Sequence, residues 1–121
     1  MKELHFNDIA DKIAKMCIDA ACILEDDITS AIDMALELEK SPLGIEVLDQ
    51  LKENAVIARE EGIPICQDTG MALFFVEYGE DVKIKGGLLN DAINEGVRKG
   101  YQKGNLRKSI VNDPITRRNT Q

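Results

Sequence analysis

The chain has little of what β-rich or disulfide-bonded small proteins usually contain. Among its 121 residues there is no tryptophan, aromatic residues make up 4%, and there are three cysteines, three prolines and one histidine. The scarcity of aromatic residues disfavours a β-sandwich or a barrel, whose strands are rich in aromatic and β-branched side chains. Three cysteines without a regular spacing do not make a disulfide framework, so a reducing, cytoplasmic setting is the simplest interpretation.

Long apolar runs are also missing. No run approaches the ~20 apolar residues of a membrane span, so we expect no membrane association. The first six residues, MKELHF, contain neither a long apolar stretch nor a small-residue cleavage site, and they lack the features of a secretory signal.

Charge is distributed unevenly along the chain, whose formal net charge is −7. From Arg98 onward there are seven basic residues and one acid, a local charge of +6, so residues 1–97 carry −13. An acidic body repels a polyanion, which disfavours a nucleic-acid partner. The basic tail is suited instead to a small anion or to an acidic protein surface.

Apolar periodicity predicts two helices in the first 40 residues. Apolar side chains recur every three or four positions over residues 9–24, and Asn7 or Asp8 is expected to cap the start of this helix. A second helix follows residues 26–27 and is expected to end near Lys40, because a proline lies two positions further on.

A third helix is predicted from its end signals. Ser41 suits the N-cap and Pro42 the first helical position, where its missing N–H costs nothing. The apolar stripe then continues to Gly62, a natural C-terminal stop. We expect the three helices to form a bundle-like layer.

The pattern changes after this point. Residues 63–70 form an irregular turn bounded by proline and glycine, and residues 71–76 (MALFFV) read as a strand buried on both faces. Residues 82–85 alternate like a half-exposed neighbouring strand. A last helix is expected between Gly86-Gly87 and Gly104.

These elements predict an α+β fold in which an N-terminal helical layer packs with a small sheet. The length suits one hydrophobic core, so residues 1–121 are interpreted as a single domain. Two strands make a poor independent sheet, and we expect a partner chain or a continuation of the chain to complete it. An open sheet edge also favours homo-oligomers.

Cys66 is the cysteine best placed for chemistry, since it lies in the turn between a helix and a strand. Gln67, Thr69 and the backbone N–H groups of the turn can stabilise a thiolate. Asp68 adds a carboxylate that can act as an acid, a base or a ligand. The alternative is that Cys66 is a small buried apolar residue, which is common for cysteine. A third possibility is a thiol redox sensor based on Cys66.

The other two cysteines are not expected to form a metal site together with Cys66. Cys17 and Cys22 are five positions apart on a predicted helix, so their side chains diverge by more than a right angle and core packing is favoured. A lone thiolate cannot hold zinc or an iron–sulfur cluster. No complete metal site is therefore expected within the 121 residues.

Two polar features near the ends have open interpretations. Arg107 stands beside Ser109 after a helix end and is either a clamp for a carboxylate, which arginine binds bidentately, or part of a solvated basic loop. His5 lies in the first few residues and is expected to be solvated.

Several motifs together resemble one family, the class I iron–sulfur fumarases and the α subunits of two-subunit fumarases and L(+)-tartrate dehydratases. The segment that carries the first cluster cysteine in that family resembles residues 64–70 (PICQDTG). The continuation is similar in order and spacing, at residues 71–76, 90–97 (NDAINEGV), 106–111 (LRKSIV), 113–114 (DP) and 117–120 (RRNT).

The resemblance implies a [4Fe–4S] hydro-lyase that eliminates water from a small hydroxy-dicarboxylate, such as malate or tartrate. It implies that Cys66 is a cluster ligand, that Gln67 and Asp68 contact the substrate with Asp68 assisting proton transfer, and that Arg107 binds a substrate carboxylate. It also implies a partner, either a β subunit or a C-terminal domain of the same enzyme.

The chain departs from the family pattern in one respect. The family's other two cluster cysteines lie further along the α region, and Cys17 and Cys22 do not stand in for them. We therefore expect residues 1–121 to be the N-terminal part of a larger α subunit, inactive alone. The alternative is a non-catalytic helical module for interaction or self-assembly that retains the fold.

Overall fold

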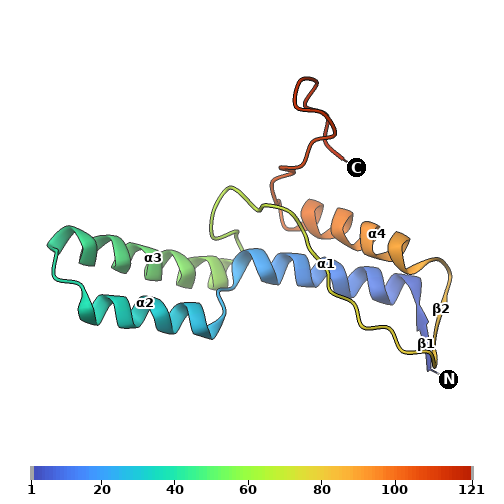
Figure 1. Cartoon of the computed structure of the whole chain (residues 1–121), viewed down its shortest axis with the longest axis horizontal. Helices are drawn as coiled ribbons and strands as arrows, with labels where there is room; N and C mark the ends of the chain where they lie inside the picture. Colours follow the sequence, from blue (N-terminus) through green and yellow to red (C-terminus); the bar gives the residue numbers. More distant parts are fainter. Residues whose placement is uncertain (1, 121) are drawn as a thin grey trace.

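The computed structural model describes residues 2–120 and has an α+β fold, as predicted (Figure 1). Helices dominate, and two short strands form the only sheet assigned within residues 2–120. In chain order the elements are β1 (Lys2–His5), α1 (Phe6–Cys22), α2 (Asp26–Leu38), α3 (Pro42–Glu61), β2 (Val82–Lys85) and α4 (Leu89–Lys103). No helix of the described chain combines the length and the apolar character that crossing a bilayer requires.

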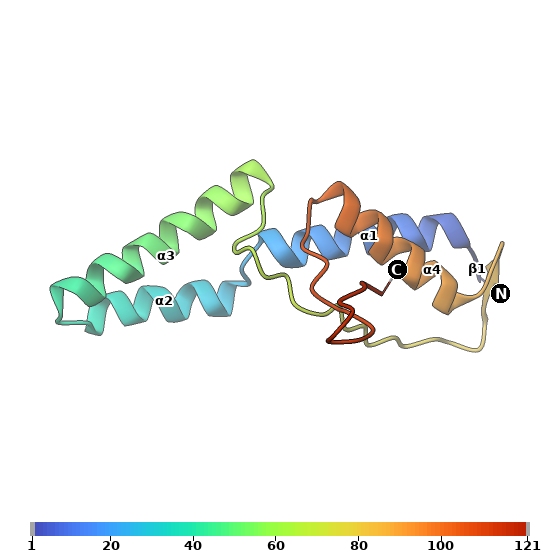
Figure 2. The ribbon, with the colours of Figure 1, turned by 90° about the horizontal axis from the view of Figure 1, so that it is seen from above.

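The core lies between α1 and α4, which run side by side in the same direction (Figures 1 and 2). Their contact is made by small residues. On α4 the buried positions are Ala92, Gly96 and Gly100, four residues apart and therefore on one face. A Cβ built on Gly96 would lie 2.6 Å from Ile13 and 2.7 Å from the carbonyl oxygen of Ala10, so the two backbones are in direct contact.

The sequence predicts this helix but does not show which face is buried. The larger apolar residues Ile93, Val97 and Tyr101 are only partly buried where they pack on the core cluster, which consists of Ile13, Cys17 and Leu106. Glycines carry no hydrophobic signal in a periodicity analysis, yet they allow the closest approach of two helices. The buried stripe therefore follows the glycines and Ala92.

The helices α2 and α3 form a hairpin that extends beyond the end of α1 (Figures 1 and 2). Both ends of α3 are capped as predicted. At its start the Ser41 hydroxyl accepts a hydrogen bond from Gly44 N and Pro42 occupies the first turn, and at its end Gly62 stops the helix with φ 66°. No residue of α2 is buried, and Ala58 is the buried residue of α3. The three helices therefore do not form the expected bundle-like layer, because α1 packs mainly on α4.

The sheet is formed by a different pair of strands from the predicted one. Strand β2 is present at residues 82–85 as expected, but it pairs in parallel with β1, where His5 lies opposite Lys85. His5 is exposed, as expected, although its backbone belongs to this strand. An ion pair of 2.7 Å between Lys85 Nζ and Glu3 Oε2 bridges the two strands.

The strand predicted at residues 71–76 is not formed. The segment is extended but has no strand partner among residues 2–120, and a strand is defined by such pairing. The predicted caps of α1 are also wrong. The helix begins at Phe6 directly after β1, with His5 at the N-cap and no side-chain cap from Asn7 or Asp8.

Candidate functional site

The turn after α3 is fixed by three hydrogen bonds. Ile63 N donates to the carbonyl oxygen of Ala58 (3.2 Å), and Ile65 N donates to that of Ala21 at the end of α1 (2.9 Å). The side-chain amide of Asn54 donates to the Ile65 carbonyl oxygen (2.8 Å). The residue before Cys66 is thus held by both α1 and α3, which gives the cysteine a defined place.

Cys66 is exposed at this turn, which excludes the alternative of a small buried apolar residue, and its thiol donates to the carbonyl oxygen of Asp68 (3.0 Å). Cys17 and Cys22 are both buried, which confirms that they pack in the core. Burial raises the pKa of the Cys17 thiol, and burial together with the charge of Asp19 raises the pKa of Cys22. Cys66 is therefore the thiol open to solvent.

The Asp68 carboxylate is held by hydrogen bonds to one of its oxygens. Gly70 N (3.2 Å) and the Ser109 hydroxyl (2.9 Å) both donate to Oδ1. The Gly70 N–H, then the Ser109 hydroxyl, with a further effect from the Arg107 charge, lower the pKa of Asp68. Asp68 is therefore an ionised acceptor at neutral pH, and no hydrogen bond among residues 2–120 involves its Oδ2.

A further hydrogen bond connects the turn at residues 66–70 with the segment after α4. The Thr69 hydroxyl donates to the carbonyl oxygen of Arg107 (2.7 Å). The chain after α4 is directed there by Asn105, which has a φ of 52°, and by the buried side chain of Leu106. The structure thus brings residues 66–70 next to residues 107–109, about 40 positions further along the sequence.

The predicted site residues lie on these two segments. Cys66, Gln67 and Asp68 are exposed on the first turn, and Arg107 is exposed on the second segment. Gln67 makes no side-chain hydrogen bond, and Arg107 no ion pair, within the described part of the chain. Their amide and guanidinium groups are available to a ligand.

Sequence reasoning missed the roles of Thr69 and Ser109. The sequence suggests Thr69 only as a thiolate-stabilising group and Ser109 only as a neighbour of Arg107. Their hydroxyl groups instead hold the two segments together. The signal that could have found them is a hydroxyl residue in each motif, but pairing two motifs so far apart requires the fold.

The basic tail is partly used in ion pairs. Arg98 binds Glu95 within α4 (2.6 Å), and Lys99 binds Asp11 on α1 (2.9 Å), so these two cations are paired with acids of the same chain. Beyond Arg107, Asn119 folds the chain back by donating to the carbonyl oxygens of Lys108 (2.6 Å) and Ile110 (3.1 Å).

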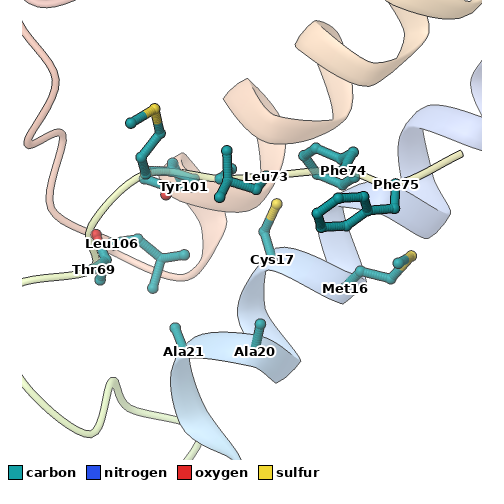
Figure 3. Close-up of a pocket in the computed structure, with 12 residues that line it drawn as sticks. Met16, Cys17, Ala20, Ala21, Thr69, Leu73, Phe74, Phe75, Tyr101 and Leu106 are labelled. Atoms are coloured by element: carbon teal, nitrogen blue, oxygen red, sulfur yellow. The ribbon is translucent and has the colours of Figure 1, made fainter.

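A groove of about 480 Å³ lies beside the turn, between α1 and the extended segment (Figure 3). Its lining is mainly apolar and includes Met16, Cys17, Phe74 and Tyr101. An apolar groove does not suit a dicarboxylate, because a buried charge needs a partner. The groove is therefore separate in chemistry from the polar surface formed by Asp68 and Arg107.

The described chain offers one exposed thiol as a soft metal ligand. Residues 2–120 contain no group of three or more His, Cys, Asp or Glu side chains placed to hold a metal ion. Cys66 fits the role of a single ligand, since its Sγ is exposed and its one hydrogen bond is to a backbone carbonyl. A cluster with three or four thiolate ligands would need the others from outside these residues.

Comparison with known proteins gives a consistent set of relatives. The sequence profile of a family described as fumarate hydratase (Fumerase) matches residues 10–121. A protein of Methanocaldococcus jannaschii, named provisionally as an L(+)-tartrate dehydratase subunit alpha, is 32% identical over 112 residues, 92% of this chain and 39% of the relative. The L(+)-tartrate dehydratase subunit alpha of Escherichia coli (strain K12) is 24% identical over 110 residues, 91% of this chain and 36% of that protein. The chain thus spans less than two-fifths of the length of these relatives.

Proposed function

The chain belongs to the fumarate hydratase family, and from this premise we propose that it is part of a [4Fe–4S]-dependent hydro-lyase that eliminates water from a hydroxy-dicarboxylate. Two of its relatives are named as tartrate dehydratase α subunits, which supports a diacid as the substrate. The same names support a β subunit, or an equivalent C-terminal domain, as the partner.

One observation carries this proposal. An exposed thiol at Cys66 lies two residues from an ionised carboxylate, and the turn that holds both is hydrogen-bonded to the segment of an exposed arginine. A soft ligand, an acceptor and a cation are thus presented together. That set matches the needs of a dicarboxylate held beside a metal centre.

Cys66 would supply one cluster ligand in this assignment, and the remaining ligands would come from outside residues 2–120. When bound, a cluster with one open iron supplies a Lewis acid for the substrate hydroxyl group. The role of this chain is then to place the substrate beside that position.

Three side chains would do so. The Arg107 guanidinium, which has no ion pair within residues 2–120, binds a substrate carboxylate through two parallel N–H···O contacts. The Gln67 amide donates to and accepts from the substrate's oxygens. Asp68 keeps Oδ2 for the substrate, since Oδ1 is taken by Gly70 and Ser109, and an ionised carboxylate accepts a hydrogen bond or a proton.

Reconstitution tests the assignment. The chain is treated with iron and sulfide, alone and together with the polypeptides that match the rest of the α subunit and the β subunit of a tartrate dehydratase relative. Malate-to-fumarate and tartrate-to-oxaloacetate conversion are then measured. We expect turnover from the assembly and none from the chain alone, and turnover by the isolated chain would contradict the expectation that it is inactive.

Cysteine variants identify the ligand. Cys66→Ser is expected to abolish turnover and to weaken the cluster's visible absorbance. The matched control is Cys17→Ala, which removes a buried thiol and leaves the turn intact. Equal loss in both variants would show that the effect is on folding and would remove the support for Cys66 as a ligand.

A second candidate function is a non-catalytic helical module for interaction or self-assembly. The observation that favours it is the exposure of large apolar residues on the α2–α3 hairpin, where Met34, Leu38 and Leu43 are 61%, 75% and 69% exposed. Large exposed apolar patches mark binding surfaces. A chain that assembles through this hairpin but never gains turnover in the reconstituted mixture would favour the module.

A further inference from the structure

The extended segment has the exposure pattern of a strand over residues 71–75. Ala72 and Phe74 are half-buried. The intervening side chains are largely exposed, at the surface of the groove that they help to line: Met71 64%, Leu73 72% and Phe75 99%. The alternation ends at Val76, which is 52% exposed. Successive side chains of a β-strand point to opposite faces, so the segment already has a strand's geometry.

Its inner face is anchored. Phe74 packs against the core cluster that contains Cys17 and Leu106. Figure 3 shows the Cys17 side chain pointing from α1 toward this segment, along which Leu73, Phe74 and Phe75 follow one another. The segment is therefore held in place over α1, which limits the entropy lost when a partner binds.

Its backbone is unpaired. Within residues 2–120 no hydrogen bond is made by the main-chain N–H or C=O groups of residues 71–77. Unpaired backbone beside apolar side chains is the surface to which an added β-strand binds: the backbone supplies hydrogen bonds and the alternate side chains supply specificity. A helix could not satisfy such an edge, because its own backbone groups are already paired.

We propose that residues 71–76 form a docking strand for a β-strand and an overlying apolar layer, supplied by the polypeptide that corresponds to the unmatched length of the α-subunit relatives. This inference rests on the proposed function for the identity of the partner. The relatives are more than twice as long as their matched parts, which make up 39% and 36% of their lengths, so they contain enough additional chain to supply such a layer.

Charge favours this partner over a second copy of the chain. The docking strand itself is uncharged, but Glu77, Glu80 and Asp81 follow it directly. Two copies would bring these acids and two bodies of charge −7 together. A strand with basic neighbours would instead be attracted to the acidic end of the docking strand.

Amide hydrogen exchange tests the inference directly. The 121-residue chain is measured alone and after co-expression with the polypeptide that follows the matched region of the Methanocaldococcus jannaschii relative. We expect rapid exchange at residues 71–77 in the chain alone and exchange slowed at least about tenfold in the complex, because pairing protects amides. Protection that is confined to other residues would overturn the proposal.

A pair of charge substitutions locates the contact. Phe75→Glu is expected to weaken the complex at least about tenfold, since a buried aromatic anchor dominates such interfaces. The control is Leu38→Glu on α2, which replaces a residue that is 75% exposed and should leave the affinity unchanged. Because Phe75 is 99% exposed, its substitution leaves the fold intact. Equal affinities for the two variants would refute the docking strand.

The remaining outcomes are also decisive. A chain that dimerises alone with protected amides at residues 71–77 has a second copy as its occupant, which contradicts the proposal. Failure to form any complex also contradicts it. A protected complex that shows no hydro-lyase turnover after reconstitution would overturn the proposed function but not the docking strand. Turnover without protection at residues 71–77 would support the proposed function but contradict the docking strand.

Discussion

The helix pair α1–α4 and the hairpin α2–α3 contain similar proportions of apolar residues but bury them very differently. In the first pair, Ala10, Ala92, Gly96 and Gly100 bring two backbones into contact. In the hairpin, Ala58 is the buried residue and large apolar side chains face solvent on both helices. Small residues allow tight packing between two helices, whereas large ones need a further surface to cover them.

The comparison predicts where the stability of the chain lies. Backbone contact leaves no room for added atoms, so the α1–α4 pair is sensitive to small changes in volume. The hairpin has few buried contacts, so its exposed positions tolerate substitution unless a partner covers them. Added volume between α1 and α4 should therefore cost much more stability than a change on the surface of the hairpin.

Gly96→Leu is expected to be the most damaging change. Even a Cβ at this position would lie 2.6 Å from Ile13, so a leucine forces the helices apart. We expect a loss of about 3 kcal/mol or more in the free energy of unfolding, measured by urea denaturation. The control is Ala31→Leu in α2, which adds bulk at an exposed position, so the effect should be near zero. Equal losses in the two variants would show that the two regions are packed alike.

The reactivity of the three thiols tests the tight packing around α1 without a mutation. Cys17 and Cys22 are buried while Cys66 is exposed, and burial raises the pKa of the first two. In a titration with a thiol reagent we expect one rapid reaction and two that are at least about 100-fold slower, because they require local opening. Three equal rates would mean that the core around α1 is open.

Removing the N-cap of α3 should have a moderate effect. The Ser41 hydroxyl accepts a long bond of 3.4 Å from Gly44 N, so Ser41→Ala is expected to cost about 0.5 kcal/mol, the low end for a cap. Thermal unfolding monitored by circular dichroism measures it. Ser41→Asp is the matched control and should restore the wild-type midpoint, and a failure to do so would show that the hydroxyl has another role.

Acid should weaken the hairpin turn through Glu39. Its carboxylate accepts from Ser41 N and Lys40 N, and these bonds lower the pKa of Glu39. A lowered pKa gives stabilisation that is present above the unfolded pKa and lost as pH falls through the folded one. Glu39→Gln should therefore lose less helix than wild type between pH 7 and pH 3, as seen by circular dichroism. Identical acid profiles would contradict this.

The smallest effect is expected at the exposed apolar face of the hairpin. Leu38 is 75% exposed, so Leu38→Gln should change the unfolding free energy by less than about 0.5 kcal/mol. Leu106→Gln, at a residue only 6% exposed in the core, is the contrasting variant and should be far more damaging. A large loss at Leu38 in the chain alone would mean that this face is already covered, as in a self-assembled form.

Most helices and strands could be predicted from local sequence signals. The four helices and β2 were predicted, because caps such as Ser41 and Gly62 and the helical periodicity act within a few residues. What the sequence did not reveal depends on contacts between distant residues. The pairing of β1 with β2, the close contact of Gly96 with α1 and the unpaired state of residues 71–76 all depend on which segments meet in space.

The candidate site shows the same division. Cys66, Asp68 and Arg107 were identified from residue type and resemblance, and the structure places Asp68 near Arg107. The two hydroxyl contacts that hold the segments together were not predicted, because each joins residues far apart in the sequence: Thr69 and Arg107 are 38 positions apart, and Asp68 and Ser109 are 41 apart. The ligand role of Cys66 and the substrate-binding roles of Asp68 and Arg107 stay predictions, which the reconstitution experiment tests.

The parallel pairing of β1 with β2 has a consequence for biosynthesis. The first strand and α1 leave the ribosome early, but their partners at residues 82–103 follow more than 75 positions later. The helices of the α2–α3 hairpin pack on each other and α3 also contacts α1, so the partners of the hairpin have all been made by residue 62 and it can form in the meantime. A nascent chain halted before residue 82 should therefore hold a folded hairpin and an N-terminal helix with its small-residue face uncovered, a natural target for chaperones until α4 emerges.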